Sequence, residues 1–372
     1  MVDRDSDGRP RLLRDPYLEW VETEGVPVAE GYGIDLLAIE TTPWPRFESR
    51  GAIAHLLGRG DFVTMFLLDL EPGGKIPPQR HLYEQLVYVL SGHGSTEITL
   101  SDGRKHQFEW GPRSLFCLPL NLAYRIFNGS GRERARIAFC NYFPLVKNLF
   151  HRDDFIFQNP CSFPEREGGD GYFAGEGDYI PIKPGWHMWE TNFVPDVGAF
   201  ELKQWDARGA GGSHINFLFP DAVMKAHCSA MPVGTYKKAH RHGPDFLIFP
   251  IAGSGYSLFW HEGEEMVKVD WRHGMVFAPP AMMYHQHFNT SPEPTRYLAV
   301  TLGSLQYPFV EERRKQMLAV DKDVKDGGRQ IEYEDQDPRI HALYLAELAR
   351  HGASSRMGKF IDESKFDVAK AG

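Results

Sequence analysis

The sequence predicts an all-β protein made of two similar barrels in tandem, followed by a helical C-terminal tail. Three observations lead to this fold class. The chain repeats itself at a fixed spacing, each repeat carries short runs rich in β-branched and aromatic residues, and turn-forming residues are abundant. Gly and Pro, at 37 and 26 of the 372 residues, together exceed the roughly 12% of average usage. Many short strands joined by tight turns are therefore expected.

The repeat has a spacing of 161 residues and needs no insertion across positions 73–128. Eleven of these 56 positions are identical in the two copies, against about three expected from average residue usage. Each half of the chain is therefore expected to be one copy of the same fold. The identical pairs are Gly73 and Gly234, Arg80 and Arg241, His81 and His242, Leu86 and Leu247, Gly92 and Gly253, Gly94 and Gly255, Trp110 and Trp271, Phe116 and Phe277, Pro119 and Pro280, Phe127 and Phe288, and Asn128 and Asn289.

Each copy has the residue pattern of β-strands. The first contains EQLVYVLSGHGSTEITL, which is interrupted at Gly92 and Gly94 and ends at a turn over residues 101–103. Its counterpart, DFLIFPIAGSGYSLFW, is interrupted at Gly253 and Gly255. Strands that recur every 8 to 12 residues or so favour an antiparallel sandwich or barrel. Closure of the barrel is expected because open strand edges promote aggregation.

These patterns divide the chain into five segments. Residues 1–50 form an N-terminal arm, 51–145 the first barrel, 146–207 a connecting segment, 208–305 the second barrel and 306–372 the tail. The connecting segment is rich in Pro, Gly and aromatic residues, so we expect it to pack across the surface with little regular structure.

Two helices are expected in the tail. Residues 310–318 are one candidate. The second begins at Asp337, an N-cap residue followed by Pro338 at the first helical position, and it stops at Gly352. Its apolar stripe consists of Ile340, Leu343, Tyr344 and Leu348.

Composition excludes several classes of function. The formal net charge of −9 argues against a nucleic-acid-binding protein and against a polybasic membrane anchor. The four cysteines lack any CxxC spacing, so they are expected to be reduced thiols rather than a disulfide framework or a zinc ribbon. No apolar run has the length of a signal peptide or a membrane span. A cytoplasmic protein is expected, and its barrel edges and acidic surface are compatible with a homodimer.

The second copy resembles the two signature stretches of the cupin superfamily, and the doubling resembles a bicupin. Cupins carry G, five residues, HxH, a Glu and a Gly in the first stretch, and G, five residues, PxG, H and N in the second. Here the matching residues are Gly234, His240, His242 and Gly253, and then Gly274, Pro280, His285 and Asn289. The resemblance implies two jelly-roll β-barrels in tandem.

Strand geometry explains why this spacing suits a metal. Residues two apart on a strand face the same side, so His240 and His242 are both expected to point into the barrel. His285 on a neighbouring strand would complete three nitrogen ligands and leave the opposite side of the metal open. Fe(II) is the metal we expect, and Mn, Ni or Zn would accept the same ligands. The same parity turns His287 inward, where we expect a catalytic acid or base, a further ligand, or a hydrogen-bond donor behind the ligands.

The chain departs from the cupin pattern in two ways. Phe246 occupies the position of the fourth ligand, a Glu, so the site would be neutral and would favour a substrate that chelates through anionic oxygens. The slide also pairs Gln79 with His240 and Tyr124 with His285, so the first copy retains only one histidine of the ligand set, His81. Gentisate dioxygenases carry their metal in the first copy, which is the reverse of this arrangement.

The resemblance to three-histidine cupins implies a non-haem Fe(II)-dependent dioxygenase. Its expected partners are O₂ and a small oxygen-rich substrate, such as a hydroxylated aromatic acid. The expected walls of the substrate pocket are Phe246, Tyr236, Trp260 and Met283. Two other classes fit the same residues: a non-redox isomerase, lyase or hydrolase that uses the metal as a Lewis acid, and a non-enzymatic protein that binds a small ligand.

Overall fold

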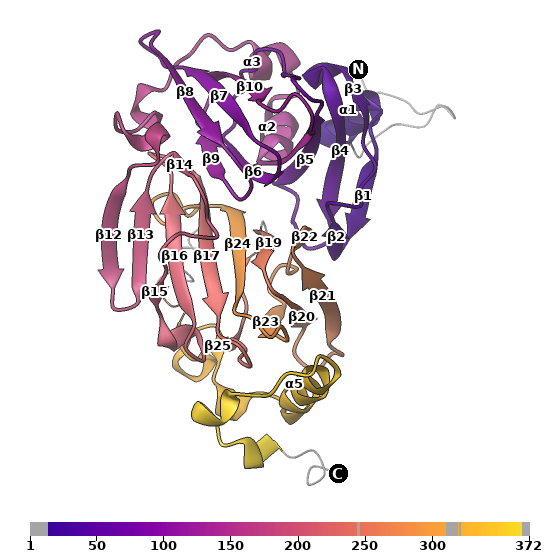
Figure 1. Cartoon of the computed structure of the whole chain (residues 1–372), viewed down its shortest axis with the longest axis vertical. Helices are drawn as coiled ribbons and strands as arrows, with labels where there is room; N and C mark the ends of the chain where they lie inside the picture. Colours follow the sequence, from indigo (N-terminus) through magenta and orange to yellow (C-terminus); the bar gives the residue numbers. More distant parts are fainter. Residues whose placement is uncertain (1–13, 244–245, 310–318, 320, 367–372) are drawn as a thin grey trace.

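A computed structural model describes residues 14–243, 246–309, 319 and 321–366. Two β-rich halves lie one above the other in Figure 1, the first from indigo to purple and the second from pink to orange, with the tail below them in yellow. Each half contains a larger and a smaller sheet, in which most strand pairs are antiparallel. The all-β fold predicted from the sequence is confirmed.

The first half is built from eleven strands in two sheets. They are β1 (Val28–Gly31), β3 (Thr42–Trp44), β4 (Ser49–Leu56), β5 (Thr64–Leu70), β6 (Gln85–Ser91), β7 (Gly94–Thr99), β8 (Lys105–Trp110), β9 (Leu115–Leu118), β10 (Ala123–Asn128), β11 (Ala135–Asn141) and β14 (Phe193–Val194). The larger sheet has the order β1-β4-β5-β11-β6-β9-β14, with β3 beside β4, and the smaller has the order β10-β7-β8.

The second half repeats this plan. Its strands are β2 (Gly33–Asp35), β12 (Asp178–Lys183), β13 (Trp186–Glu190), β15 (Lys203–Gln204), β16 (Ser213–Leu218), β17 (Met224–Met231), β18 (Ala239–His240), β19 (Phe246–Ala252), β20 (Ser254–Trp260), β21 (Val267–Arg272), β22 (Met275–Phe277), β23 (Tyr284–Asn289), β24 (Thr295–Leu302) and β25 (Gln330–Ile331). The larger sheet has the order β12-β13-β16-β17-β24-β19-β22-β2, with β15 beside β16, and the smaller has the order β21-β20-β23-β18-β25.

The spacing of 161 residues carries the strands of one half onto those of the other. It superposes the bounds of β6 on β19 and of β10 on β23 without any shift, and those of β5 and β11 on β17 and β24 to within one residue. The repeat predicted from eleven identities therefore extends beyond positions 73–128 and covers the jelly-roll strands of both barrels. The fold is a bicupin.

The two halves exchange a short strand reciprocally. β2, from the N-terminal arm, pairs with β22 of the second barrel, and β14, from the connecting segment, pairs with β9 of the first. β9 and β22 are themselves equivalent under the slide. Each barrel therefore depends on a strand that lies outside its own predicted segment.

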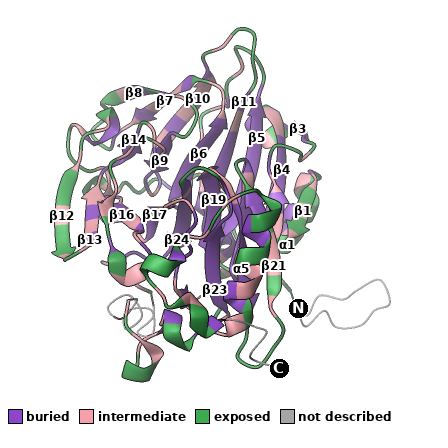
Figure 2. Cartoon of the chain, turned by 60° about the horizontal axis from the view of Figure 1, so that its bottom comes forward, coloured by how far each residue is buried: buried purple, intermediate pink, exposed green. Residues whose placement is uncertain are grey.

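The larger sheets of the two halves share one hydrophobic core. Tyr88 and Phe249, which are equivalent under the slide, meet with ring centroids 5.1 Å apart, and one cluster of buried residues includes strands of both halves. All seven residues of β5 are buried because this strand has apolar neighbours on both faces. In Figure 2 the central strands are purple, whereas the helices and the outer hairpins carry most of the green.

The connecting segment contains more regular structure than the sequence predicted. It includes α2 (Phe143–Phe150) and α3 (Asp153–Phe157), and β12, β13 and β15 extend the larger sheet of the second half. The expectation of little regular structure was wrong because an edge strand binds a neighbour through backbone groups, whatever the side-chain composition.

The arm and the tail add helices at the two ends of the chain. α1 (Pro16–Glu24) is capped by Asp15, and α5 (Pro338–Arg350) is capped by Asp337 with Pro338 at its first position, as predicted. The stripe of α5 buries Ile340, Tyr344 and Leu348 against the smaller sheet of the second half. The other predicted helix, residues 310–318, lies outside the described residues. Among the residues described, no helix combines the length and apolar character needed to cross a membrane.

Candidate metal centre

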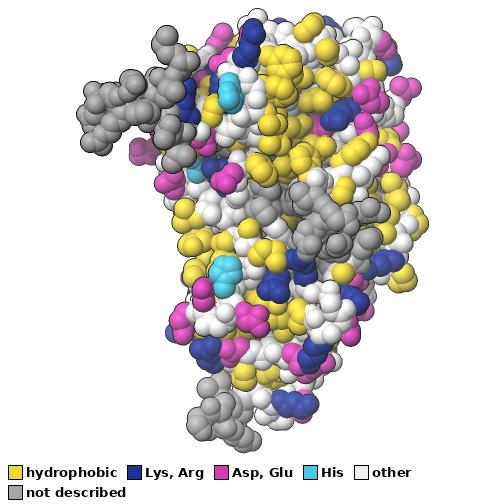
Figure 3. All heavy atoms as spheres, turned by 180° about the vertical axis from the view of Figure 1, so that it is seen from behind, with side chains coloured by type: hydrophobic (Ala, Val, Ile, Leu, Met, Phe, Trp, Pro, Cys, Tyr) yellow, Lys and Arg dark blue, Asp and Glu magenta, His cyan; other side chains and the backbone are white. Residues whose placement is uncertain are grey.

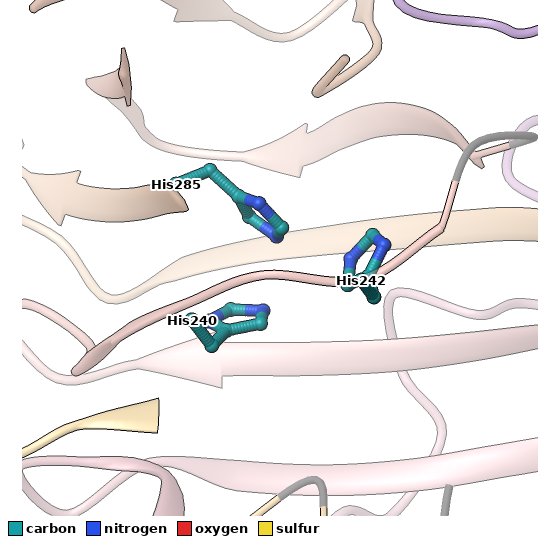
Figure 4. Close-up of side chains that lie close together, drawn as sticks. All are labelled: His240, His242 and His285. Atoms are coloured by element: carbon teal, nitrogen blue, oxygen red, sulfur yellow. The ribbon is translucent and has the colours of Figure 1, made fainter. Parts of the chain in front are cut away.

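Three predicted ligands lie together inside the second barrel. β18 pairs with β23 so that His240 lies directly opposite His285, and His242 follows in the next loop. The ring centroid of His285 lies 4.2 Å from that of His240 and 4.4 Å from that of His242. One ring nitrogen from each histidine lies within 4.8 Å of the other two. Figure 4 shows the three rings turned toward a common space.

Backbone carbonyls fix the tautomer of all three rings. Nδ1 lies 3.2 Å from the Lys238 oxygen in His240, 2.8 Å from the Gly243 oxygen in His242, and 3.2 Å from the Met283 oxygen in His285. A carbonyl can only accept, so each Nδ1 carries the proton and donates it. Each Nε2 is then a lone-pair nitrogen, the form that binds a metal.

The buried state of the rings fits a metal site. Burial lowers the pKa of His285 to about 3 and that of His240 well below its ordinary value, so both rings are neutral at physiological pH. Nε2 of His285 is buried and has no hydrogen-bond partner among the described residues. An unpaired buried acceptor is costly, and a cation shared by three imidazoles would supply the missing partner. This donor set suits a divalent transition metal such as Fe, Mn, Ni or Zn.

The position of the fourth cupin ligand is apolar. Phe246 begins β19, lines the cavity and places its ring centroid 4.0 Å from that of His242. No Asp or Glu of the described residues lines the same cavity. Asp245, the neighbour of Phe246, lies outside the described residues. The described part of the site therefore presents neutral nitrogen ligands without a balancing carboxylate.

His287 lies beside the three histidines in the opposite tautomer. It faces inward from β23 with its ring centroid 5.5 Å from that of His285. Its Nδ1 is 2.8 Å from the Ser257 hydroxyl, which also accepts the Trp271 indole N–H at 3.0 Å. Among the described residues, His287 Nδ1 is the acceptor available to the Ser257 proton, so we assign the His287 proton to Nε2. His287 is therefore a hydrogen-bond donor toward the cavity rather than a fourth lone-pair ligand.

The cavity around the site holds about 910 Å³ of empty space, including its opening to solvent. Two parallel indoles, Trp186 and Trp205, lie in its wall with centroids 5.9 Å apart. The wall is otherwise rich in basic and aromatic side chains: Arg208, His214, Lys225, His227, Lys237, Arg241, Tyr297 and Arg329.

Three residues expected on the pocket wall do not line this cavity. Tyr236 and Trp260 belong to the cluster between the smaller sheet and the tail, and Met283 packs at the edge of a separate cluster. The reason is strand parity: Tyr236 alternates with Lys237, and Trp260 with Phe259, so the tyrosine and the tryptophan face outward. Phe246 lies where it was predicted.

Sequence reasoning missed the basic part of the wall. On β17, Lys225, His227 and Ser229 are two residues apart and line the cavity together. Polar residues at alternate positions of a largely apolar strand were the available signal. Arg241 was expected to face outward by parity, but β18 ends at His240, and the Arg241 guanidinium lies 4.5 Å from the Tyr284 ring centroid at the cavity.

The fold and the three-histidine cluster define the chain as a bicupin with one candidate metal centre. Among curated proteins it is similar to the auxin-binding proteins T85 and T92 of Nicotiana tabacum, each 29% identical over 97 residues, which cover 25% of this chain. The chain spans about half, 51%, of the length of these relatives. No protein-family model matches the chain.

Solved structures of oxalate decarboxylase from Bacillus subtilis are also similar. A serine-to-alanine mutant of that enzyme has a TM-score of 0.48 at 14% identity, over 73% of this chain and 77% of that chain. The structure of the enzyme at pH 4.6 has a TM-score of 0.46 at 13% identity, over 73% of this chain and 76% of that chain. Similarity at this level does not transfer an activity to this chain.

Proposed function

We propose that the chain is a non-haem Fe(II)-dependent dioxygenase that acts on a small, oxygen-rich substrate, a hydroxylated aromatic acid. One observation carries the proposal. Three buried histidines in one tautomer present their Nε2 atoms to a common space, and the position of a fourth ligand holds Phe246. Such a set occupies one face of a metal ion and leaves the other face for small molecules.

Charge supports an anionic, chelating substrate. Three neutral imidazoles leave the +2 charge of the metal unbalanced, and no described acidic side chain lines the cavity. A phenolate and a carboxylate on neighbouring ring carbons would supply two oxygen donors and two negative charges. The indoles of Trp186 and Trp205 and the ring of Phe246 provide apolar surface for an aromatic body.

The chain's own residues position the reactants and handle protons. The bound metal would hold the substrate's oxygens and provide the centre at which O₂ is activated. His240, His242 and His285 would hold the metal, each fixed by its backbone carbonyl. His287 Nε2–H can donate to a substrate oxygen, and Ser257 keeps the opposite nitrogen engaged. The aromatic walls exclude water around these groups.

Oxygen uptake tests the proposal. Protein reconstituted anaerobically with Fe(II) should consume O₂ when gentisate or salicylate is added, whereas His285→Ala treated in the same way should not. Retention of iron together with substrate conversion that needs no O₂ would favour the non-redox alternative, a lyase, isomerase or hydrolase. Failure to retain Fe, Mn, Ni or Zn would overturn the enzyme assignment in favour of a binding protein.

A further inference from the structure

The cavity next to the metal centre concentrates positive charge in an acidic protein. The net charge of the chain is −9, and acidic and basic side chains are interspersed over the face seen in Figure 3. In the cavity, by contrast, Lys225, Lys237 and Arg208 line the wall, and no Asp or Glu of the described residues accompanies them. Lys225 and Lys237 expose only 9% and 5% of their surface. Burial of ammonium groups is unfavourable unless an anion compensates for it.

Lys237 lacks a carboxylate partner among the described residues. Its Nζ lies 5.0 Å from the ring centroid of Tyr297, and its pKa is lowered from the ordinary lysine value, first by burial. Its backbone N–H donates to the His287 oxygen, which fixes the start of the side chain beside the metal centre. The side chain faces the cavity because Tyr236, its neighbour, faces outward.

Neutral residues complete this part of the wall. The His214 Nδ1–H donates to Ser229 Oγ at 2.8 Å, and His214 Nε2 accepts from Asn216 at 3.0 Å. The ring of His227 lies 5.0 Å from that of His214. Burial lowers the pKa of both histidines well below the ordinary value, and the nearby Lys225 and Lys237 lower it further. These two histidines are therefore neutral, and no described side chain of this wall offers a compensating negative charge.

We propose that Lys225, Lys237 and Arg208 form a second subsite, which binds a carboxylate of the substrate at a distance from the oxygens that chelate the metal. The inference rests on the proposed function for the metal-bound end of the substrate. It narrows the substrate class to hydroxylated aromatic acids with a further carboxylate. A charge-assisted hydrogen bond to a buried lysine is expected to increase affinity by about 10-fold or more.

A matched pair of ligands tests the subsite without turnover. Salicylate and 4-hydroxyisophthalate share the chelating phenolate and carboxylate, and the second compound adds one carboxylate across the ring. Calorimetric titration of Zn-loaded protein under nitrogen should show 4-hydroxyisophthalate binding at least about 10-fold more tightly. Lys237→Met should remove this advantage and leave the Kd of salicylate within about 2-fold, whereas Lys237→Arg should keep part of it. Lys105→Met, at an exposed lysine of β8, is the control and should change neither Kd.

Equal affinity of the two acids for the wild-type protein would overturn the subsite, and this comparison needs no variant. An equal loss of both affinities in Lys237→Met would also contradict it, because a damaged pocket would affect both ligands. The result is independent of oxygen chemistry. A preserved advantage for 4-hydroxyisophthalate without O₂ uptake would keep the subsite and reject the dioxygenase.

Discussion

The two barrels place different side chains on the same frame. Gln79 bridges to Tyr124 in the first barrel, as His240 pairs with His285 in the second. In the first barrel the Tyr124 hydroxyl lies 3.1 Å from both His81 Nε2 and Gln85 Nε2, and Asn141 donates to Gln85 Oε1 at 3.2 Å. In the second, Nε2 of His285 is left without a partner among the described residues. The first centre satisfies its polar atoms internally, whereas the second requires something from outside.

The hydrogen bonds around both centres are otherwise repeated. The Trp110 indole donates to Thr96, and the equivalent Trp271 donates to Ser257. Asn128 and Asn289 each donate to three backbone oxygens at equivalent turns. The comparison teaches that the jelly roll tolerates either solution, so a few side chains decide whether a barrel is structural or metal-binding.

The strongest way to break the comparison is to build the second centre in the first barrel. Gln79→His together with Tyr124→His restores three histidines around His81, whose Nδ1 already lies 2.7 Å from the Tyr83 oxygen. The double variant should bind a second equivalent of Zn or Fe, with lower affinity because Gln85 and Asn141 were not selected around a metal. Metal analysis of the purified protein measures this. A folded double variant that still binds at most one equivalent would show that the frames differ.

A second prediction concerns stability in acid. Burial lowers the pKa of His81 to about 4, whereas an unfolded chain keeps it near 6.5. Between these values the unfolded chain binds more protons, so the free energy of unfolding decreases as the pH falls from about 6.5 to 4, by on the order of 3 kcal/mol. Metal-free His81→Gln should lose correspondingly less stability than the wild type in urea unfolding at pH 7 and pH 4. Parallel losses in the two proteins would show that His81 is not held neutral.

The smallest predicted effect separates the two repeated indole contacts. Ser257→Ala removes the donor that fixes the tautomer of His287, so kcat should fall about 10-fold while metal content is unchanged. Thr96→Val removes the equivalent contact in the first barrel and should leave kcat unchanged, because Ile126 stands where the second barrel has His287. The proposed role of Ser257 fails if both variants lose activity equally, or if Ser257→Ala also loses its metal.

The sequence predicted the parts of the site that depend on spacing. His240, His242 and His285 could be placed because strand periodicity and the repeat fix which residues share a face. Tyr236 and Trp260 were misplaced, since aromatic residues pack on either face of a sheet and only the register decides which one. Lys225 and His227 were missed because β17 reaches the centre through tertiary packing that no motif marks. The reciprocal exchange of β2 and β14 was also invisible, because such short strands leave no periodic signal.

The metal-to-protein ratio tests the central claim most directly. Protein purified anaerobically and supplied with Fe(II) should retain close to one equivalent in the wild type and in His81→Gln, and almost none in the double variant His240→Ala, His285→Ala. Full occupancy in the double variant, or none in the wild type, would show that the second barrel does not hold the metal through these histidines.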